Sequence, residues 1–100
     1  MKHFIIESAF NVPFEQLGET LPEHRRFLQR GYEANRLLCS GPQSTQKGGI
    51  MVARASSLEE IQGFFAEDPY QKKGLATYRF IEFSPVLYHK LIESWVAASE

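Results

Sequence analysis

The order of the periodic segments restricts this chain to very few folds. Over residues 2–10, side chains alternate between two faces as they do in a strand, and Phe4 and Ile6 share one face. The other predicted elements follow in chain order: a helix over about 21–34, strands over 37–39 and 50–55, a helix from Leu58 that ends before Asp68, and a strand over 75–83. The predicted order is therefore strand, helix, strand, strand, helix, strand.

That order is the split βαβ pattern of ferredoxin-like folds, in which two helices pack on one face of a four-stranded antiparallel sheet. A chain of 100 residues is long enough for one such α+β domain and too short for two. We therefore predict a single domain over 1–100, with a core over about 2–85 and a helical extension over about 86–98. In that extension Leu87, Leu91 and Trp95 would form an apolar stripe.

Capping and turn residues locate the ends of the predicted elements. Thr20 and Ser57 are each followed by a glutamate three positions later, which is the pattern of a capping box at a helix start. Asn35 tolerates the left-handed conformation and is a plausible end for the first helix. Ser84 and Pro85 should end the last strand.

Two of the predicted strands carry large apolar side chains on both faces. In the strand over 75–83, Ile81 and Phe83 point one way, and Tyr78 and Phe80 point the other way. An antiparallel sheet with one wet face alternates apolar with polar residues, so we expect the second face to be covered. A homodimer through this sheet face is our first expectation, and the terminal helix folding over its own sheet is the second. Both can contribute.

The charge balance and the single cysteine exclude several classes of function. Eleven Lys and Arg residues oppose twelve Asp and Glu residues without clustering, so we expect neither a nucleic-acid partner nor an anionic membrane surface. No segment approaches the roughly 18 apolar residues of a membrane span. One cysteine and three scattered histidines offer no zinc spacing and no internal disulfide. We expect a cytoplasmic protein with no metal and no cofactor.

His24 lies on the apolar side of the first predicted helix, between the outward-facing Glu23 and Arg25. Gly31 lies two turns further along nearly the same line, either as a packing accommodation or as the floor of a cavity. A histidine on an apolar face is more often a hydrogen-bonded core residue than a catalyst. Both interpretations of His24 stay open at this point.

Asp68 precedes Pro69, and Gly74 follows six residues after Asp68. This spacing predicts an N-cap for a one-turn helix that Gly74 ends. The functional alternative is that the carboxylate orients a nearby imidazole, as a general base requires.

The segment Ser40-Gly41-Pro42 reads either as a bulge or strand exit, or as a backbone that approaches a ligand closely. Cys39 is expected to pack as a small hydrophobic residue. His3 and His89 are expected at the surface or at an interface.

Several of these pieces, in this order and spacing, resemble the YciI-like (YCII-related) family of small α+β proteins. The pieces are His24 with Leu28, the segment 36–42, the segment 57–62, and Asp68-Pro69-Tyr70 followed by Gly74. The resemblance spans about residues 4–85 and implies a dimeric α+β barrel. It also implies an active-site pocket in which His24 and Asp68 form a dyad. We therefore take these two residues as catalytic candidates, and as ligand-binding candidates Ser40, Gly41, Pro42, Tyr70 and Arg25.

The sequence also departs from the family pattern. Leu21 stands where an arginine is often found one turn before the histidine, and Asn35 stands where glycine is usual. Arg25 could replace the lost arginine only if its side chain turns inward. The predicted terminal helix extends beyond the usual end of the family.

Two hypotheses for function follow. In the first, the protein is an enzyme in which His24 and Asp68 carry out general acid–base chemistry on a small organic ligand, possibly cyclic or aromatic. The resemblance implies an elimination or isomerisation, because one branch of the family resembles dehydrochlorinases of chlorinated hydroxyhydroquinones. In the alternative, the protein is a non-catalytic dimeric ligand-binding or interaction module, and the same pair is a structural hydrogen bond. Fold alone does not choose between them.

Overall fold

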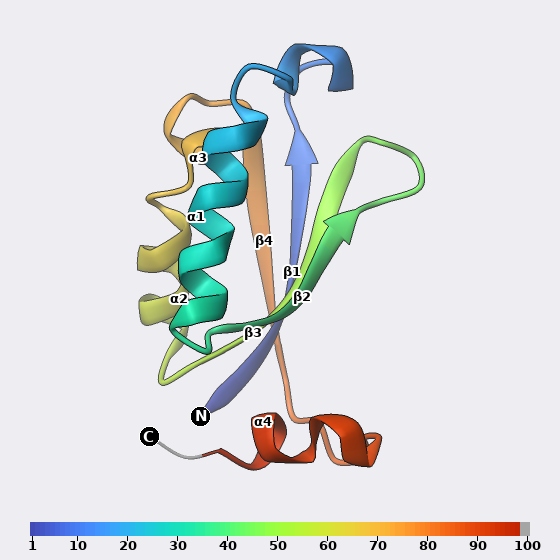
Figure 1. Cartoon of the computed structure of the whole chain (residues 1–100), viewed down its shortest axis with the longest axis vertical. Helices are drawn as coiled ribbons and strands as arrows, with labels where there is room; N and C mark the ends of the chain where they lie inside the picture. Colours follow the sequence, from blue (N-terminus) through green and yellow to red (C-terminus); the bar gives the residue numbers. More distant parts are fainter. Residues whose placement is uncertain (99–100) are drawn as a thin grey trace.

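The computed structural model describes residues 1–98 and contains the core elements in the predicted order (Figure 1). Residues 99 and 100 of the predicted domain lie outside the described residues. No helix of residues 1–98 has the length and apolar character needed to cross a membrane. The elements are β1 (Lys2–Phe10), η1 (Phe14–Leu17), α1 (Leu21–Glu33), β2 (Leu37–Pro42), β3 (Gly48–Ala55), α2 (Leu58–Phe65), α3 (Pro69–Lys72), β4 (Ala76–Phe83), η2 (Lys90–Ile92) and α4 (Glu93–Ala97).

The strands form one four-stranded antiparallel sheet in the order β2-β3-β1-β4. Figure 1 shows α1, α2 and α3 together on one face of this sheet, so the predicted α+β ferredoxin-like arrangement is confirmed. β1 lies in the interior of the sheet, where Ile6 is opposite Met51 on one side and Phe80 on the other. The core between the sheet and the helices contains Phe4, Ile6, Phe27, Leu37, Met51, Ala53, Ala55, Ile61 and Phe65.

The first helix ends at the predicted residue and begins differently from the prediction. Asn35 has a φ of 58°, and the amides of Asn35 and Arg36 donate to the carbonyls of Tyr32 and Gly31, which is the Schellman arrangement. The capping box at Thr20 is wrong, because the Thr20 hydroxyl makes no cap hydrogen bond. The hydroxyl instead accepts from Lys73 Nζ at 3.3 Å, across the contact between α1 and α3.

The second helix starts at the predicted cap. Ser57 Oγ accepts from the amide of Glu60 at 3.0 Å, as a capping box requires. The Glu60 carboxylate accepts from the amide and hydroxyl of Ser56, one residue before the cap. These hydrogen bonds to Ser56, followed by the nearby Arg36 charge, lower the pKa of Glu60.

An irregularity in β2 changes which residues face the helices. Leu37 is opposite Ala53, but Cys39 is opposite Val52 and Ser40 is opposite Met51, so one extra residue is inserted at Leu38. Because side chains alternate along a strand, the extra residue turns Ser40 toward the helix side and Cys39 toward the other face. The prediction that Cys39 packs as a small hydrophobic residue is therefore wrong, because the residue is exposed.

The prediction of a continuous helix over about 86–98 is also wrong. Between β4 and residue 98 the chain is irregular apart from the short helices η2 and α4. Leu87 is 92% exposed and Leu91 is 83% exposed, so these two residues of the predicted apolar stripe have no surface to pack on. A helix in a protein draws most of its stability from such packing, which is absent here.

The terminal segment with α4 lies at one end of the sheet (Figure 1), where Trp95 anchors it. Its ring meets the His3 ring edge to face at a centroid distance of 5.5 Å, and the Arg54 guanidinium lies 5.3 Å from its centroid. Arg54 Nη1 also donates to the Trp95 carbonyl at 2.9 Å. His3, which was predicted at the surface or at an interface, is consequently buried by a contact within the chain. The terminal segment thus covers one end of its own second sheet face, which was the second of the two expected covers.

Candidate active site

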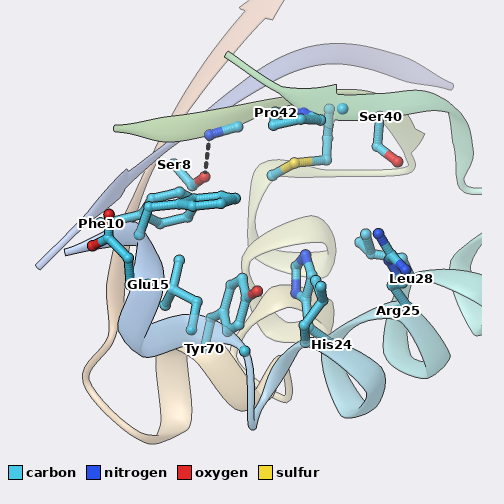
Figure 2. A pocket seen from close by; sticks show the side chains of 16 residues that line it. Ser8, Phe10, Glu15, His24, Arg25, Leu28, Ser40, Pro42 and Tyr70 are labelled. Carbon is cyan, nitrogen blue, oxygen red and sulfur yellow. Dashed lines mark hydrogen bonds between the residues drawn. The ribbon is translucent and has the colours of Figure 1, made fainter. Parts of the chain in front are cut away.

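A cavity of about 440 Å³ lies between α1, η1 and the helix-facing side of the sheet. Its volume falls within the range of small-molecule sites. Figure 2 shows His24 and Tyr70 on one wall and the end of β2 on the opposite wall. The lining residues are predominantly apolar. They are Ser8, Phe10, Phe14, Glu15, Leu17, Gly18, Leu21, His24, Arg25, Leu28, Ser40, Gly41, Pro42, Gly49, Met51 and Tyr70.

The structure brings His24 and Asp68 into contact. His24 Nδ1 lies 2.9 Å from Asp68 Oδ1 and 3.1 Å from Oδ2. His24 comes from the first half of α1, and Asp68 precedes α3, so 44 positions separate them in the chain. The imidazole is partly exposed to the cavity, whereas the Asp68 side chain is fully buried behind it.

Asp68 is surrounded by hydrogen-bond donors. Besides His24, the amide of Tyr70 donates to Oδ1 at 3.0 Å, and the hydroxyl of Tyr78 donates to Oδ2. The Tyr70 contact is the predicted N-cap of α3, and Gly74 closes that turn with a φ of 70°. Burial, followed by the Asp68 charge, raises the pKa of Tyr78, so its hydroxyl keeps its proton and donates. A carboxylate buried among three donors satisfies the rule that buried charges be paired.

The contact with Asp68 determines which imidazole nitrogen is available to a ligand. An ionised carboxylate can only accept hydrogen bonds, so the Nδ1 atom of His24 that faces it carries the hydrogen. In the neutral ring, Nε2 then has a free lone pair. Among residues 1–98, Nε2 has no hydrogen-bond partner. Figure 2 shows the His24 ring standing in the cavity wall with its outer edge toward the strands. This arrangement can accept a proton at Nε2 and stabilise the resulting imidazolium through Asp68.

Tyr70 stacks on the imidazole. The two ring centroids are 3.9 Å apart, and the planes differ by 8°. The Phe10 ring contacts the Tyr70 ring edge to face, and their centroids are 6.0 Å apart. Burial, followed by the Asp68 charge, raises the pKa of the Tyr70 hydroxyl, while the charge of Arg25 acts in the opposite direction.

The other predicted ligand-binding residues all line the same cavity. Ser40, Gly41 and Pro42 form the wall opposite His24, and Arg25 lies at the side near Leu28 (Figure 2). Ser40 Oγ lies 2.6 Å from the hydroxyl of Tyr32, which belongs to α1. The inward turn of Ser40 follows from the bulge in β2.

Gly31 allows α1 to pack closely on β2 and does not line the cavity. A Cβ atom at Gly31 would lie 2.8 Å from Leu37 Cδ1, so the helix and β2 approach each other closely there. Of the two alternatives for this glycine, the packing accommodation is the correct one.

Sequence reasoning missed several residues of the site, among them Tyr78, Ser8, Phe10 and Met51. A signal for the first three was present, because Tyr78 shares the inward face of its strand with Ala76 and Phe80, and Ser8 and Phe10 continue the face of Phe4 and Ile6. Ser8 Oγ accepts from the Gly49 amide at 2.8 Å, a bond drawn in Figure 2. The short helix η1, which brings Phe14, Glu15 and Leu17 to the cavity, had no recognisable pattern.

Comparison with known proteins agrees with this architecture. The family model of the YCII-related domain matches residues 1–84. Among solved structures, the chain is similar to 5-chloro-2-hydroxyhydroquinone dehydrochlorinase from Burkholderia phenoliruptrix AC1100 in complex with 2,5-dihydroxybenzoquinone. The TM-score is 0.64 at 18% identity, over 83% of this chain and 91% of that chain. No curated protein matches the sequence. At this identity the structural likeness shows a shared fold.

Proposed function

The chain belongs to the YCII-related domain family, and we propose that it is an enzyme that transfers protons to and from a small organic substrate. His24 is the general acid–base and Asp68 orients it. The observation that carries the proposal is the contact of 2.9 Å between His24 Nδ1 and a fully buried carboxylate, at the wall of a mostly apolar cavity. A free Nε2 held in a defined tautomer is what general base catalysis requires.

The proposed reaction class is an elimination or an isomerisation. His24 Nε2 takes a proton from a substrate C–H or O–H bond, and the electron pair of that bond stays on the substrate. In an elimination, the pair forms a double bond while a leaving group departs from the neighbouring atom with its own bonding pair. In an isomerisation, the imidazolium returns the proton to a different atom. Asp68 remains ionised throughout and stabilises the imidazolium.

The apolar walls favour a compact and unsaturated substrate. Phe10, Phe14 and Met51 supply flat or adaptable surface, and the cavity volume of about 440 Å³ suits a single substituted ring. The structurally similar dehydrochlorinase, which was solved with 2,5-dihydroxybenzoquinone, supports a cyclic oxygenated substrate class. Ser40, Gly41 and Pro42 would contact the face of the ring opposite His24.

The proposal is tested with a panel of chlorinated hydroquinones and hydroxyhydroquinones, by chloride release and by the change in ring absorbance. We expect turnover of at least one compound, and a loss of about 10²–10⁴-fold in kcat for His24→Asn. The amide group of Asn can still donate to Asp68, so we expect little change in the melting temperature. His89→Asn, an exposed histidine outside the cavity, is the matched control.

The opposite pattern favours the alternative function. If a ring compound binds without turnover, and His24→Asn changes the melting temperature but not the affinity, the pair is structural and the protein is a ligand-binding module.

We also propose that a second copy of the chain covers the remaining sheet face. The outward side of the sheet carries Ile81 and Phe83, which are 37% and 40% exposed, next to the half-buried Ile5 and Val52. The terminal segment covers only the end near His3. Isologous pairing of this face would remove these side chains from water.

A further inference from the structure

The Tyr70 hydroxyl is a hydrogen-bond donor without a partner among residues 1–98. Its side chain is only 4% exposed, yet it lines the cavity, and Figure 2 shows the oxygen on the side of the ring that faces the cavity and His24. The hydroxyl is thus open to the cavity, and a donor without a protein partner at the wall of a cavity of ligand size is available to a group on the ligand. That group must be an acceptor if the hydroxyl keeps its proton.

The rigidity of Tyr70 makes this donor a preorganised one. Its ring is stacked on His24 at 3.9 Å and contacted by Phe10, and its amide is bonded to Asp68. The hydroxyl therefore cannot turn away to another acceptor without disrupting the catalytic pair. Burial raises its pKa, which keeps the proton on the oxygen at neutral pH.

Arg25 provides positive charge to the same part of the cavity. The Arg25 side chain lines the cavity, makes no ion pair or hydrogen bond among the described residues, and acts on the Tyr70 hydroxyl electrostatically. Glu15, the one carboxylate among the lining residues of the described chain, lies beside Phe10, on the far side of Tyr70 from Arg25 (Figure 2). The region next to His24 is consequently rich in donors and positive charge.

We propose that Tyr70 and Arg25 bind a negatively charged oxygen of the substrate beside the position where His24 exchanges its proton. The substrate class is then a small ring compound with a phenolic, enolic or carbonyl oxygen at that position. The inference rests on the proposed function and deepens it, because it names the chemical group that the same site recognises.

The chemistry of proton removal requires such a site. When His24 Nε2 takes a proton from a carbon next to a carbonyl group, the C–H electron pair forms a carbon–carbon double bond. The π pair of the carbonyl group then moves onto its oxygen, which becomes an enolate. In a largely apolar cavity that charge is costly unless donors are already in place. The Tyr70 hydroxyl is such a donor, and the exposed Arg25 at the side of the cavity adds positive charge.

The experiment uses 4-nitrophenol as the probe, because its phenolate absorbs visible light and its phenol does not. The whole protein is titrated into the probe from mildly acidic to neutral pH. We expect the bound probe to ionise at a lower pH than the free probe, with phenolate binding about tenfold tighter than phenol. Nitrobenzene, which has no ionisable oxygen, measures binding of the ring alone.

Two variants assign this preference to residues. Tyr70→Phe keeps the stacked ring and removes only the hydroxyl, so it should weaken phenolate binding about tenfold and leave nitrobenzene binding unchanged. Arg25→Gln should weaken phenolate binding by less, with reduced salt dependence. The matched controls are Tyr88→Phe and Arg26→Gln, which lie outside the cavity and should change nothing.

The proposal is overturned if the probe does not bind, if it binds as the neutral phenol, or if Tyr70→Phe leaves phenolate affinity intact. It is also overturned if His24→Asn alone removes the preference for phenolate, because the imidazole would then be the anion-binding group. A preference for phenolate that depends on Tyr70, in a protein that turns over no compound of the panel, upholds the anion site and refutes the catalytic proposal. Turnover that depends on His24 but not on Tyr70 upholds the catalytic proposal and refutes the anion site.

Discussion

One carboxylate oxygen of Asp68 accepts hydrogen bonds from both the Tyr70 amide and the His24 imidazole. The cap interpretation and the imidazole-partner interpretation of this residue therefore do not exclude each other. Capping holds the carboxylate at a defined point, and the same fixed oxygen orients the ring. Tyr78 completes the arrangement from β4, a contact that no sequence spacing predicted.

His3 gives a prediction for the dependence of the fold on pH. Its pKa is lowered from 6.5, first by burial and then by the charges of the N-terminus and Arg54, so protonation is less favourable in the folded state than in the unfolded chain. A lowered histidine pKa means that the unfolded state binds more protons below pH 6.5. Stability contributed by neutral His3 is therefore complete above that pH and is lost as pH falls below it.

The measurement is the fluorescence of Trp95, the one tryptophan of the chain, which packs on His3. We expect its emission to shift toward that of exposed tryptophan as the pH falls below 6.5. His3→Phe keeps an aromatic contact without a titrating group and should abolish the shift, whereas His89→Phe should not. An unchanged pH profile in His3→Phe would refute this role of His3.

At the scale of elements, the register between β1 and β3 depends on one glycine. A Cβ atom at Gly48 would lie 1.8 Å from the Ser8 carbonyl oxygen, a distance that only a backbone shift could relieve. The nearby bond from the Gly49 amide to Ser8 Oγ, at the cavity wall, would be lost with it. By allowing β1 and β3 to approach each other, Gly48 therefore helps to hold Ser8 and Gly49 at the cavity wall.

We expect Gly48→Ala to destabilise the protein by about 2–4 kcal/mol, as overpacking against backbone does. Gly63→Ala is the control, because a Cβ there meets nothing within 4 Å and the residue lies in α2. Alanine in an exposed helix should stabilise the protein by about 0.5–1 kcal/mol. Chemical denaturation of both variants measures the difference, and equal stabilities would contradict the close approach at Gly48.

At the scale of the whole molecule, the apolar residues on the outer sheet face are the main feature that a single copy leaves unexplained. We expect sedimentation equilibrium at micromolar concentration to show a species of twice the chain mass of 11.5 kDa. Ile81→Glu should shift the equilibrium toward the monomer by more than tenfold, because a carboxylate would be buried at the interface.

The control for assembly is Gln62→Glu, which adds the same charge on an exposed position of α2 and should leave the assembly unchanged. A single 11.5 kDa species in the unsubstituted protein would refute the homodimer.

Much of the fold was readable from local chemistry. Local patterns predicted the alternation in β1 and β4, the left-handed Asn35 and the Ser57 cap. Each of these features depends on residues within a few positions of one another, so the sequence alone indicates it. The terminal segment was mispredicted for the opposite reason. Its helical pattern was adequate, but its structure depends on what Trp95 contacts across the fold.

The sequence by itself determined the order of the elements, the helix face of His24 and the cap at Asp68, because each is set by interactions over a few residues. Only the tertiary structure decided that these two residues meet, because 44 positions separate them and the contact exists only once α1 and α3 pack together. The same holds for the inward turn of Ser40, which one extra residue in β2 reverses. Long-range contacts arise from the packing of whole elements, and no local spacing encodes them.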